Sequence, residues 1–362
     1  MAGLETNLTN SSRCPKCLMP SIAVEQSSQG CSYCLPNSEH DKVTVGDTFI
    51  ANDNSDLTIE QVRELTAKST GKYDCLVGIT GGRDSSFLLY YTKKVLGLNP
   101  LAVNFSTGFQ TPEAVHNMSD ATTRLGVDFI RYSINRSFMQ KIQKGFFTKY
   151  GEFCSPCHKG HHYTLAKFAR ENGIKVIIRG ISSKVDLNKI NPDYFNYFCQ
   201  NDQEFSDRLM DIASEFGITK DEIEFHQDMI HLDKWKSHDV LTIDLPDMLE
   251  WNYQDIQSIL DSEFDWKYPE KQFFHCDCKL NPTLCYMEYC DHGYSEKQIV
   301  ISNLLANGDI DIDKGRYFLE EEEVSETPDN IDSALSLVGV DRGAFKNIIE
   351  KFWKNGRESC QS

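Results

Sequence analysis

The chain has 362 residues, of which 40% are hydrophobic and 25% are charged. This composition is typical of a globular protein with a sizeable core and room for about two domains. The formal net charge of −17 argues against broad binding of nucleic acid, which depends on clustered Lys and Arg side chains. No run approaches the roughly 20 apolar residues of a membrane span, and the first residues, MAGLETNLTNSSRC, lack the pattern of a signal peptide. We therefore expect a cytoplasmic protein with no membrane span and no nucleic-acid partner.

Residues 1–57 are expected to form a zinc-ribbon-like unit followed by a polar linker. The unit contains two Cys-x-x-Cys pairs, CPKC and CSYC, whose members are Cys14, Cys17, Cys31 and Cys34. Four thiolates at this spacing suit tetrahedral Zn²⁺, and the segment has too few apolar residues to fold without such a staple. A redox pair is less favoured, because neither knuckle opens an evident helix that would lower a thiol pKa. We predict a structural Zn²⁺ site.

Residues 58–246 show apolar strands that alternate with helices. The expected strands are 73–80, 100–105, 127–133, 175–179 and 240–246, and the expected helices are about 58–69, 85–96, 112–125, 136–150 and 162–172. This order is typical of a doubly wound α/β domain with a mostly parallel sheet that is covered on both faces. Residues 184–245 are aromatic, acidic and less regular.

The turn TGGRDSS, residues 80–86, follows the first of these strands and opens a helix. In open α/β sheets, ligands bind outside the carboxyl ends of the strands. Two glycines let backbone N–H groups approach an anion, the helix N-terminus adds a favourable dipole, and Thr80, Ser85 and Ser86 supply hydroxyls. The turn matches neither G-x-x-x-x-G-K-[ST] nor G-x-G-x-x-G. We interpret it as a phosphate-binding turn; an ordinary capped strand–helix turn is the alternative.

The pattern [ST]-G-G-x-D-S resembles the loop of the PP-loop ATP pyrophosphatases, which have an adenine nucleotide alpha hydrolase-like fold and split ATP between its α and β phosphates. The resemblance implies that Asp84 lies near Mg²⁺ and that adenine lies near the end of the next strand. The nucleotide-binding residues that we predict are Thr80, Gly81, Gly82, Asp84, Ser85, Ser86, Asn104 and Gly180. The loop departs from the usual form in having Thr80 for Ser and Arg83 for Lys or Val.

A second cysteine pair, Cys154 and Cys157, comes shortly before the helix expected at 162–172 and should lie at the same carboxyl edge. Three interpretations remain open. The pair could bind a second Zn²⁺ or an iron–sulfur cluster together with later thiols, act as a catalytic thiol or persulfide carrier, or consist of buried reduced cysteines. The later thiols are Cys276, Cys278, Cys285 and Cys290, of which Cys278 is the ligand we predict.

Residues 247–362 are expected to form a helical region that contains the later cysteines. The predicted helices are 247–263, 294–306, 329–338 and 343–354. The acidic run from Glu320 to Glu323 is interpreted as a solvated face or a helix start.

Four motifs together resemble the N-acetyl sugar amidotransferase family of bacterial surface-polysaccharide biosynthesis, over residues 14 to about 315. They are CPKCLMP at 14–20 with the loop, GEFCSPCH at 151–158, FDWK at 264–267, and Asp277-Cys278. The resemblance implies that ATP adenylates the acetamido oxygen of an N-acetyl sugar, linked to a nucleotide, and that ammonia from a separate glutaminase subunit completes an acetamidino group. Asp84, Arg83, Cys154 and Cys157 are the catalytic residues that we predict, and Arg179 and Lys184 are further candidates for stabilising charge.

Two other functions remain open. A PP-loop sulfur transferase would use the same adenylation, with Cys154 and Cys157 as cluster ligands or sulfur carriers. A binding module, in which a zinc ribbon accompanies a degenerate nucleotide-binding domain, would bind ATP without releasing pyrophosphate.

Overall fold

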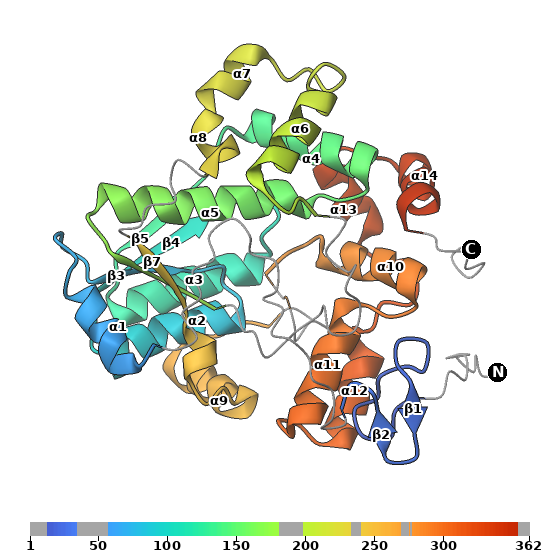
Figure 1. The fold of residues 1–362 in the computed structure, drawn as a ribbon, viewed down its shortest axis with the longest axis horizontal. Coiled ribbons are helices and arrows are strands. Elements are labelled where there is room, and N and C mark those ends of the chain that lie inside the picture. The colour runs from blue at the N-terminus through green and yellow to red at the C-terminus, as the bar shows by residue number, and fades with distance from the viewer. Residues whose placement is uncertain are drawn as a thin grey trace.

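The computed structural model describes residues 13–34, 57–180, 198–232, 240–268, 275 and 277–353. The predictions for Lys184 and Cys276, and for most of the linker, lie outside the described residues. A parallel sheet with helices on both faces lies beside a C-terminal helical region, and the N-terminal unit packs against that region (Figure 1).

Five parallel strands form the sheet in the order β5-β4-β3-β6-β7. Their bounds are β3 Cys75–Gly78, β4 Pro100–Phe105, β5 Phe129–Tyr132, β6 Val176–Arg179 and β7 Leu241–Asp244. The chain first adds strands on one side of β3 and then crosses over to add β6 and β7 on the other side. The direction of winding therefore reverses at β3, and the loop after β3 opens at a topological switch point, where doubly wound folds bind their ligands.

Successive residues of β3 point to opposite faces and enter two different cores. Val77 packs with Leu88 of α2 (Arg83–Tyr90), whereas Leu76 packs with Leu165 of α5 (Cys154–Glu171). The first face also carries α1 (Ile59–Thr66), α3 (Pro112–Leu125) and α9 (Tyr253–Glu263), and α5 covers the second (Figure 1). The predicted α/β class with a sheet covered on both faces is confirmed.

A group of helices extends from the α5 face: α4 (Arg136–Tyr150), α6 (Asp202–Ala213), α7 (Lys220–Phe225) and α8 (Gln227–Ile230). The last three lie in the stretch that the sequence analysis described as less regular. The caps of α6 and α7 were readable in the sequence: Asn201 accepts from the amide of Glu204, and Thr219 forms a capping box with Glu222.

Residues 277–353 contain five helices: α10 (Asn281–His292), α11 (Glu296–Asn307), α12 (Ile312–Glu322), α13 (Ile331–Val338) and α14 (Arg342–Phe352). Helices α10 and α12 were not predicted. Helix α10 is buried on nearly all sides, so its sequence lacks the apolar stripe by which a surface helix is recognised.

Three local predictions are wrong. Helix α5 starts at Cys154 rather than at 162, so the cysteine pair forms its first turn. Helix α9 starts at Tyr253 rather than at 247, because Pro246 lies in a 3₁₀ turn and Asn252 caps the helix by accepting two backbone N–H bonds. The acidic run is not wholly solvated, since Glu322 is buried and pairs with the buried Lys297 at 2.8 Å.

The hydrophobic core on the α2 face continues past residue 246. Trp251 packs edge-on against Phe87 at 5.3 Å between ring centroids, and Phe264 packs against Tyr90 at 6.2 Å. None of the helices in the described ranges combines the length and apolarity needed to cross a bilayer.

Candidate functional site

The glycine turn needs glycine at Gly81 for two reasons. Its φ is +85°, in the left-handed region that side chains rarely adopt, and a Cβ there would lie 2.1 Å from the carbonyl oxygen of Ala114 in α3. Gly82 then caps α2 in an extended conformation, and no side chain caps this helix terminus. The first-turn N–H groups of α2 are therefore left for another acceptor, as in anion-binding helix termini.

The hydroxyls of the turn divide between two roles. The Ser85 hydroxyl accepts from the Thr80 amide at 3.1 Å and donates to the Gly82 carbonyl at 3.1 Å, so it holds the turn itself. The Thr80 hydroxyl lies 3.2 Å from that of Ser85. Ser86 is fully buried, and its hydroxyl has no hydrogen-bond partner among the described residues. Nucleotide binding by Thr80 and Ser85 stays a prediction, and the structure buries Ser86 away from the surface of the turn.

Arg83 and Asp84 form a charged pair in the first turn of α2. The Arg83 Nε donates to Asp84 Oδ1 at 3.0 Å, and the guanidinium stacks on the ring of Tyr253 in α9 at 4.0 Å. Burial raises the pKa of Tyr253, and the Asp84 charge adds to this effect. Arg83 is thus held toward α9, while Asp84 is the more exposed of the pair.

Residues from the neighbouring strands close around the turn. Asn104 in β4 is buried and donates from Nδ2 to the carbonyl of Ile79 at 2.8 Å, which ties β4 to the end of β3. A Cβ on Gly180, just after β6, would lie 3.7 Å from the amide nitrogen of Ser85. Arg179 pairs with Asp244 of β7 at 2.7 Å, so its charge is balanced within the sheet.

A segment from the C-terminal region supplies a carboxylate that the sequence analysis did not assign to the site. Residues 277–279 run antiparallel to the loop after β4: the Thr111 amide donates to the Asp277 carbonyl at 3.1 Å, and the Lys279 amide donates to the Phe109 carbonyl at 2.8 Å. A Cβ on Gly82 would lie 3.5 Å from Asp277 Oδ2. The Asp277 carboxylate therefore faces the glycine turn. The Asp-Cys pair was visible in the sequence, but its place beside the turn was not.

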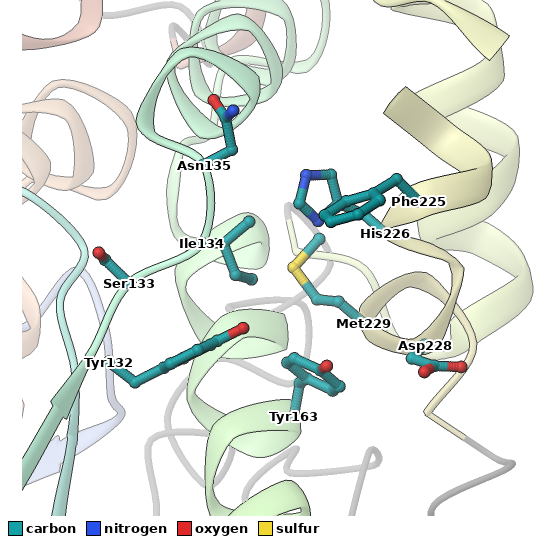
Figure 2. A pocket seen from close by; sticks show the side chains of 9 residues that line it. All are labelled: Tyr132, Ser133, Ile134, Asn135, Tyr163, Phe225, His226, Asp228 and Met229. Carbon is teal, nitrogen blue, oxygen red and sulfur yellow. The ribbon is translucent and has the colours of Figure 1, made fainter. Parts of the chain in front are cut away.

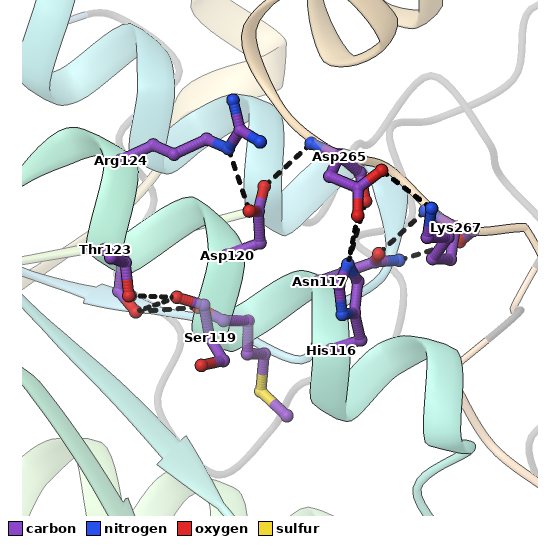
Figure 3. A network of polar contacts seen from close by, with 10 residues as sticks. His116, Asn117, Ser119, Asp120, Thr123, Arg124, Asp265 and Lys267 are labelled. Atoms are coloured by element: carbon purple, nitrogen blue, oxygen red, sulfur yellow. Dashed lines mark hydrogen bonds and ion pairs between the residues drawn. The ribbon is translucent and has the colours of Figure 1, made fainter.

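The FDWK segment also reaches the turn, through α3. Asn117 of α3 is buried; its Nδ2 donates to the Lys267 carbonyl at 2.9 Å, and its Oδ1 accepts from the Lys267 amide at 2.9 Å (Figure 3). The same Nδ2 donates to the Gly81 carbonyl at 3.3 Å. His116 and Asp265, 3.3 Å apart, add a second contact between the segment and α3. Asn117 was not predicted as a site residue, yet it fixes the carbonyl of the left-handed glycine.

Cys154, Cys157 and Cys278 lie close enough together for their charges to interact. Burial is the main cause of these raised pKa values, which reach about 12 for Cys278, and the charge of Cys278 adds to the pKa of Cys154 and Cys157. Gln143 Nε2 donates to Cys157 Sγ at 3.4 Å. Among the described residues, these three sulfurs do not all lie within 4.8 Å of one another, the spacing expected of ligands to one metal ion. Cys290, another candidate ligand, is disulfide-bonded. The second metal site stays a prediction.

The four N-terminal cysteines do form such a set. Their ligand atoms all lie within 4.8 Å of one another, with Cys14 and Cys34 sulfurs 3.6 Å apart and Cys17 and Cys31 sulfurs 3.5 Å apart. Tetrahedral Zn²⁺ with bonds of about 2.3 Å would separate its sulfurs by about 3.8 Å. The chemistry and spacing of the donors therefore fit a metal ion.

The knuckle is fastened to the C-terminal region through α11. Gln298 accepts a hydrogen bond from Arg13 and donates to the Leu18 carbonyl at 3.3 Å. Leu305 of the same helix packs on the cysteine cluster.

Comparisons with known proteins give limited similarity. No protein-family model matches the chain. An uncharacterized protein of Methanocaldococcus jannaschii is 30% identical over 125 residues, which are 34% of this chain and 43% of that protein, so the match spans less than half of the relative. The structure of NMN synthetase from Francisella tularensis covers 56% of this chain and 84% of its own, at 14% identity and a TM-score of 0.29. At that score the likeness has no bearing on function.

Proposed function

We propose that the chain is a PP-loop-type enzyme that uses ATP to adenylate an amide oxygen, with release of pyrophosphate. The observation that carries this proposal is the glycine turn: an uncapped helix N-terminus at the switch point of a parallel sheet, with the Asp84 and Asp277 carboxylates beside it. Backbone N–H groups at such a terminus suit an anionic group. They would stabilise the negative charge that builds up on departing pyrophosphate.

The two carboxylates fit Mg²⁺, which prefers oxygen ligands and is commonly bound through one or two carboxylates plus substrate phosphates. Mg²⁺ would neutralise phosphate charge. Arg83, held by Asp84 and Tyr253, keeps a positive charge beside the turn. Asn117 donates to the Gly81 carbonyl, and the Ala114 backbone leaves no room for a Cβ at Gly81, so the amides of the turn are oriented before the nucleotide arrives.

We further propose that the acceptor is the acetamido group of an N-acetyl sugar. Its oxygen attacks the α-phosphorus, the bond from that phosphorus to the bridging oxygen breaks, and pyrophosphate leaves. Ammonia then adds to the imidate carbon, the carbon–oxygen bond breaks, and AMP leaves. Loss of a proton from the new nitrogen gives the acetamidino group. By the family resemblance, a separate glutaminase subunit would supply the ammonia.

A sulfur transferase is the second candidate, because Cys154, Cys157 and Cys278 lie near one another in this region of the chain. A cluster-bound sulfide, or the outer sulfur of a persulfide, would then attack the activated carbon in place of ammonia, and AMP would leave. In the persulfide case a second thiol would attack the carrier sulfur, which breaks the S–S bond to the product and leaves a disulfide on the protein.

The test is product analysis from ATP, Mg²⁺, ammonium and UDP-N-acetylglucosamine. An amidotransferase releases pyrophosphate and AMP. Its product is lighter than the acceptor sugar by the difference in mass between an oxygen atom and an NH group. The product of a sulfur transferase is heavier than the acceptor sugar by the difference in mass between sulfur and oxygen, and it forms only when a sulfur donor is present. ATP binding without pyrophosphate release from a panel of N-acetyl sugars would favour the binding-module alternative. Glutamine used as efficiently as ammonium by the purified chain would contradict the separate glutaminase.

A further inference from the structure

A cavity of about 300 Å³ lies at the carboxyl end of β5, outside the glycine turn. Three parts of the chain form it: the β5–α4 loop, one side chain of α5, and the corner between α7 and α8 (Figure 2). Its lining residues are Tyr132, Ser133, Ile134, Asn135, Tyr163, Phe225, His226, Asp228 and Met229. The volume is at the lower end of the range for small-molecule sites.

The cavity is rich in rings and poor in charge. Tyr132 and Tyr163 have ring centroids 6.4 Å apart at 57°, and Phe225 across the cavity is 82% exposed (Figure 2). His226 stacks on Phe138 at 4.2 Å, and burial lowers the pKa of its imidazole, which favours the uncharged form. No Lys or Arg is among the described lining residues, and Asp228 is the one carboxylate among them. Such a surface disfavours a phosphate and favours an uncharged ring with apolar faces and polar edges.

The wall that carries Phe225 is fastened at both ends. Lys141 of α4 donates to both carboxylate oxygens of Glu222 in α7, at 2.8 and 2.9 Å. The buried Lys159 of α5 donates to the carbonyl of Ile230 in α8 at 3.0 Å. The cavity is therefore formed before any ligand binds, which lowers the entropic cost of binding.

The cavity and the glycine turn lie at the same edge of the sheet. Tyr132 ends β5, which is separated from β3 by β4 alone, so the ends of these two strands are two strand spacings, or about 10 Å, apart. The cavity lies on the α5 side of the sheet, where Tyr132 packs against Tyr163 and Phe168, and the turn leads into α2 on the other side. We propose that this cavity binds an uncharged, hydrogen-bonding ring of the acceptor, either a pyranose or a nucleobase, while the turn binds ATP. Describing the ring as part of the acceptor rests on the proposed function; the presence of a ring-binding site does not.

The test uses the full chain with labelled Met and Ile methyl groups, titrated with N-acetylglucosamine, uridine or inorganic phosphate. Met229 and Ile134 line the cavity, whereas Met118 in α3 and Ile79 before the turn report on other parts of the core. We expect at least one of the two ring compounds, but not phosphate, to shift the Met229 and Ile134 resonances. Whether N-acetylglucosamine or uridine does so identifies the ring as a sugar or a base.

The matched variants are Phe225→Ala and Met210→Ala. Both side chains are apolar and exposed, at 82% and 57% of their surface respectively, but only Phe225 lines the cavity. Phe225→Ala should weaken ring binding by about fivefold or more, the effect of losing one stacking contact, and Met210→Ala should leave it unchanged. Equal affinity in both variants, no shift with either ring compound, or phosphate binding at Met229 overturns the proposal. If pyrophosphate release is normal but these binding tests fail, only the proposal that the cavity binds a ring is contradicted. Ring binding without pyrophosphate release supports the cavity and contradicts the proposed function.

Discussion

Replacing Gly81 with alanine tests whether the backbone of the turn is the centre of the site. At φ +85° an alanine costs roughly 1–2 kcal/mol more than glycine. Its Cβ would also lie 2.1 Å from the Ala114 carbonyl oxygen and 2.8 Å from the Ala114 Cα, backbone atoms that move only if the start of α3 moves. Overpacking of this kind costs roughly 1–3 kcal/mol. The sum predicts a loss of folding free energy on the order of 2–5 kcal/mol.

Gly97 provides the control, because its φ is +71° and a Cβ there meets nothing within 4 Å. Gly97→Ala should therefore lose only the folding free energy that a left-handed backbone conformation costs an alanine. Urea unfolding gives both free energies, and pyrophosphate release from ATP gives the activity. In Gly81→Ala the turn should shift by about 1 Å, which should lower pyrophosphate release on the order of 100-fold. Gly97→Ala should not move the turn and should remain active. Equal stability of the two variants, or full activity of Gly81→Ala, would refute this account of the turn.

Three further predictions concern the turn, the cysteine knuckle and the C-terminal helices. Asp277→Asn should lower pyrophosphate release and raise the Mg²⁺ concentration needed for activity. The melting temperature should change little, because the backbone hydrogen bond of Asp277 remains. An unchanged Mg²⁺ titration would exclude Asp277 from the site. If the four cysteines bind Zn²⁺ as predicted, chelation should expose the α11 amides near Gln298 to hydrogen exchange, since the knuckle packs there. Unchanged exchange after confirmed metal loss would contradict this. Burial raises the pKa of Glu323 from 4.5 to about 7, so its contribution to stability is full below pH 4.5 and falls as pH rises toward 7. Glu323→Gln should flatten that part of the stability–pH curve, measured by urea unfolding, whereas the exposed Glu321→Gln should not.

The parts of the fold that were predicted correctly have strong local patterns. The strands VIIR and PLAVNF are mostly apolar, and Thr111 caps a helix whose first residue is Pro112. Helix α10 was missed because tertiary burial on nearly all sides removes the apolar stripe. Glu322 was misread because an acidic side chain can be buried when a lysine from a distant helix, here Lys297, pairs with it.

The sequence by itself determined the strand–helix alternation, the glycine turn and the knuckle spacing, because each is set by residues close together in the chain. Only the tertiary structure decided which distant side chains meet the turn. Asp277 reaches Gly82 across almost 200 residues because its segment pairs with the loop after β4, and Asn117 joins Gly81 to Lys267 in the same way. The cavity at β5 likewise arises where three separate segments pack together. Such contacts depend on how elements pack, which no local pattern of residues specifies.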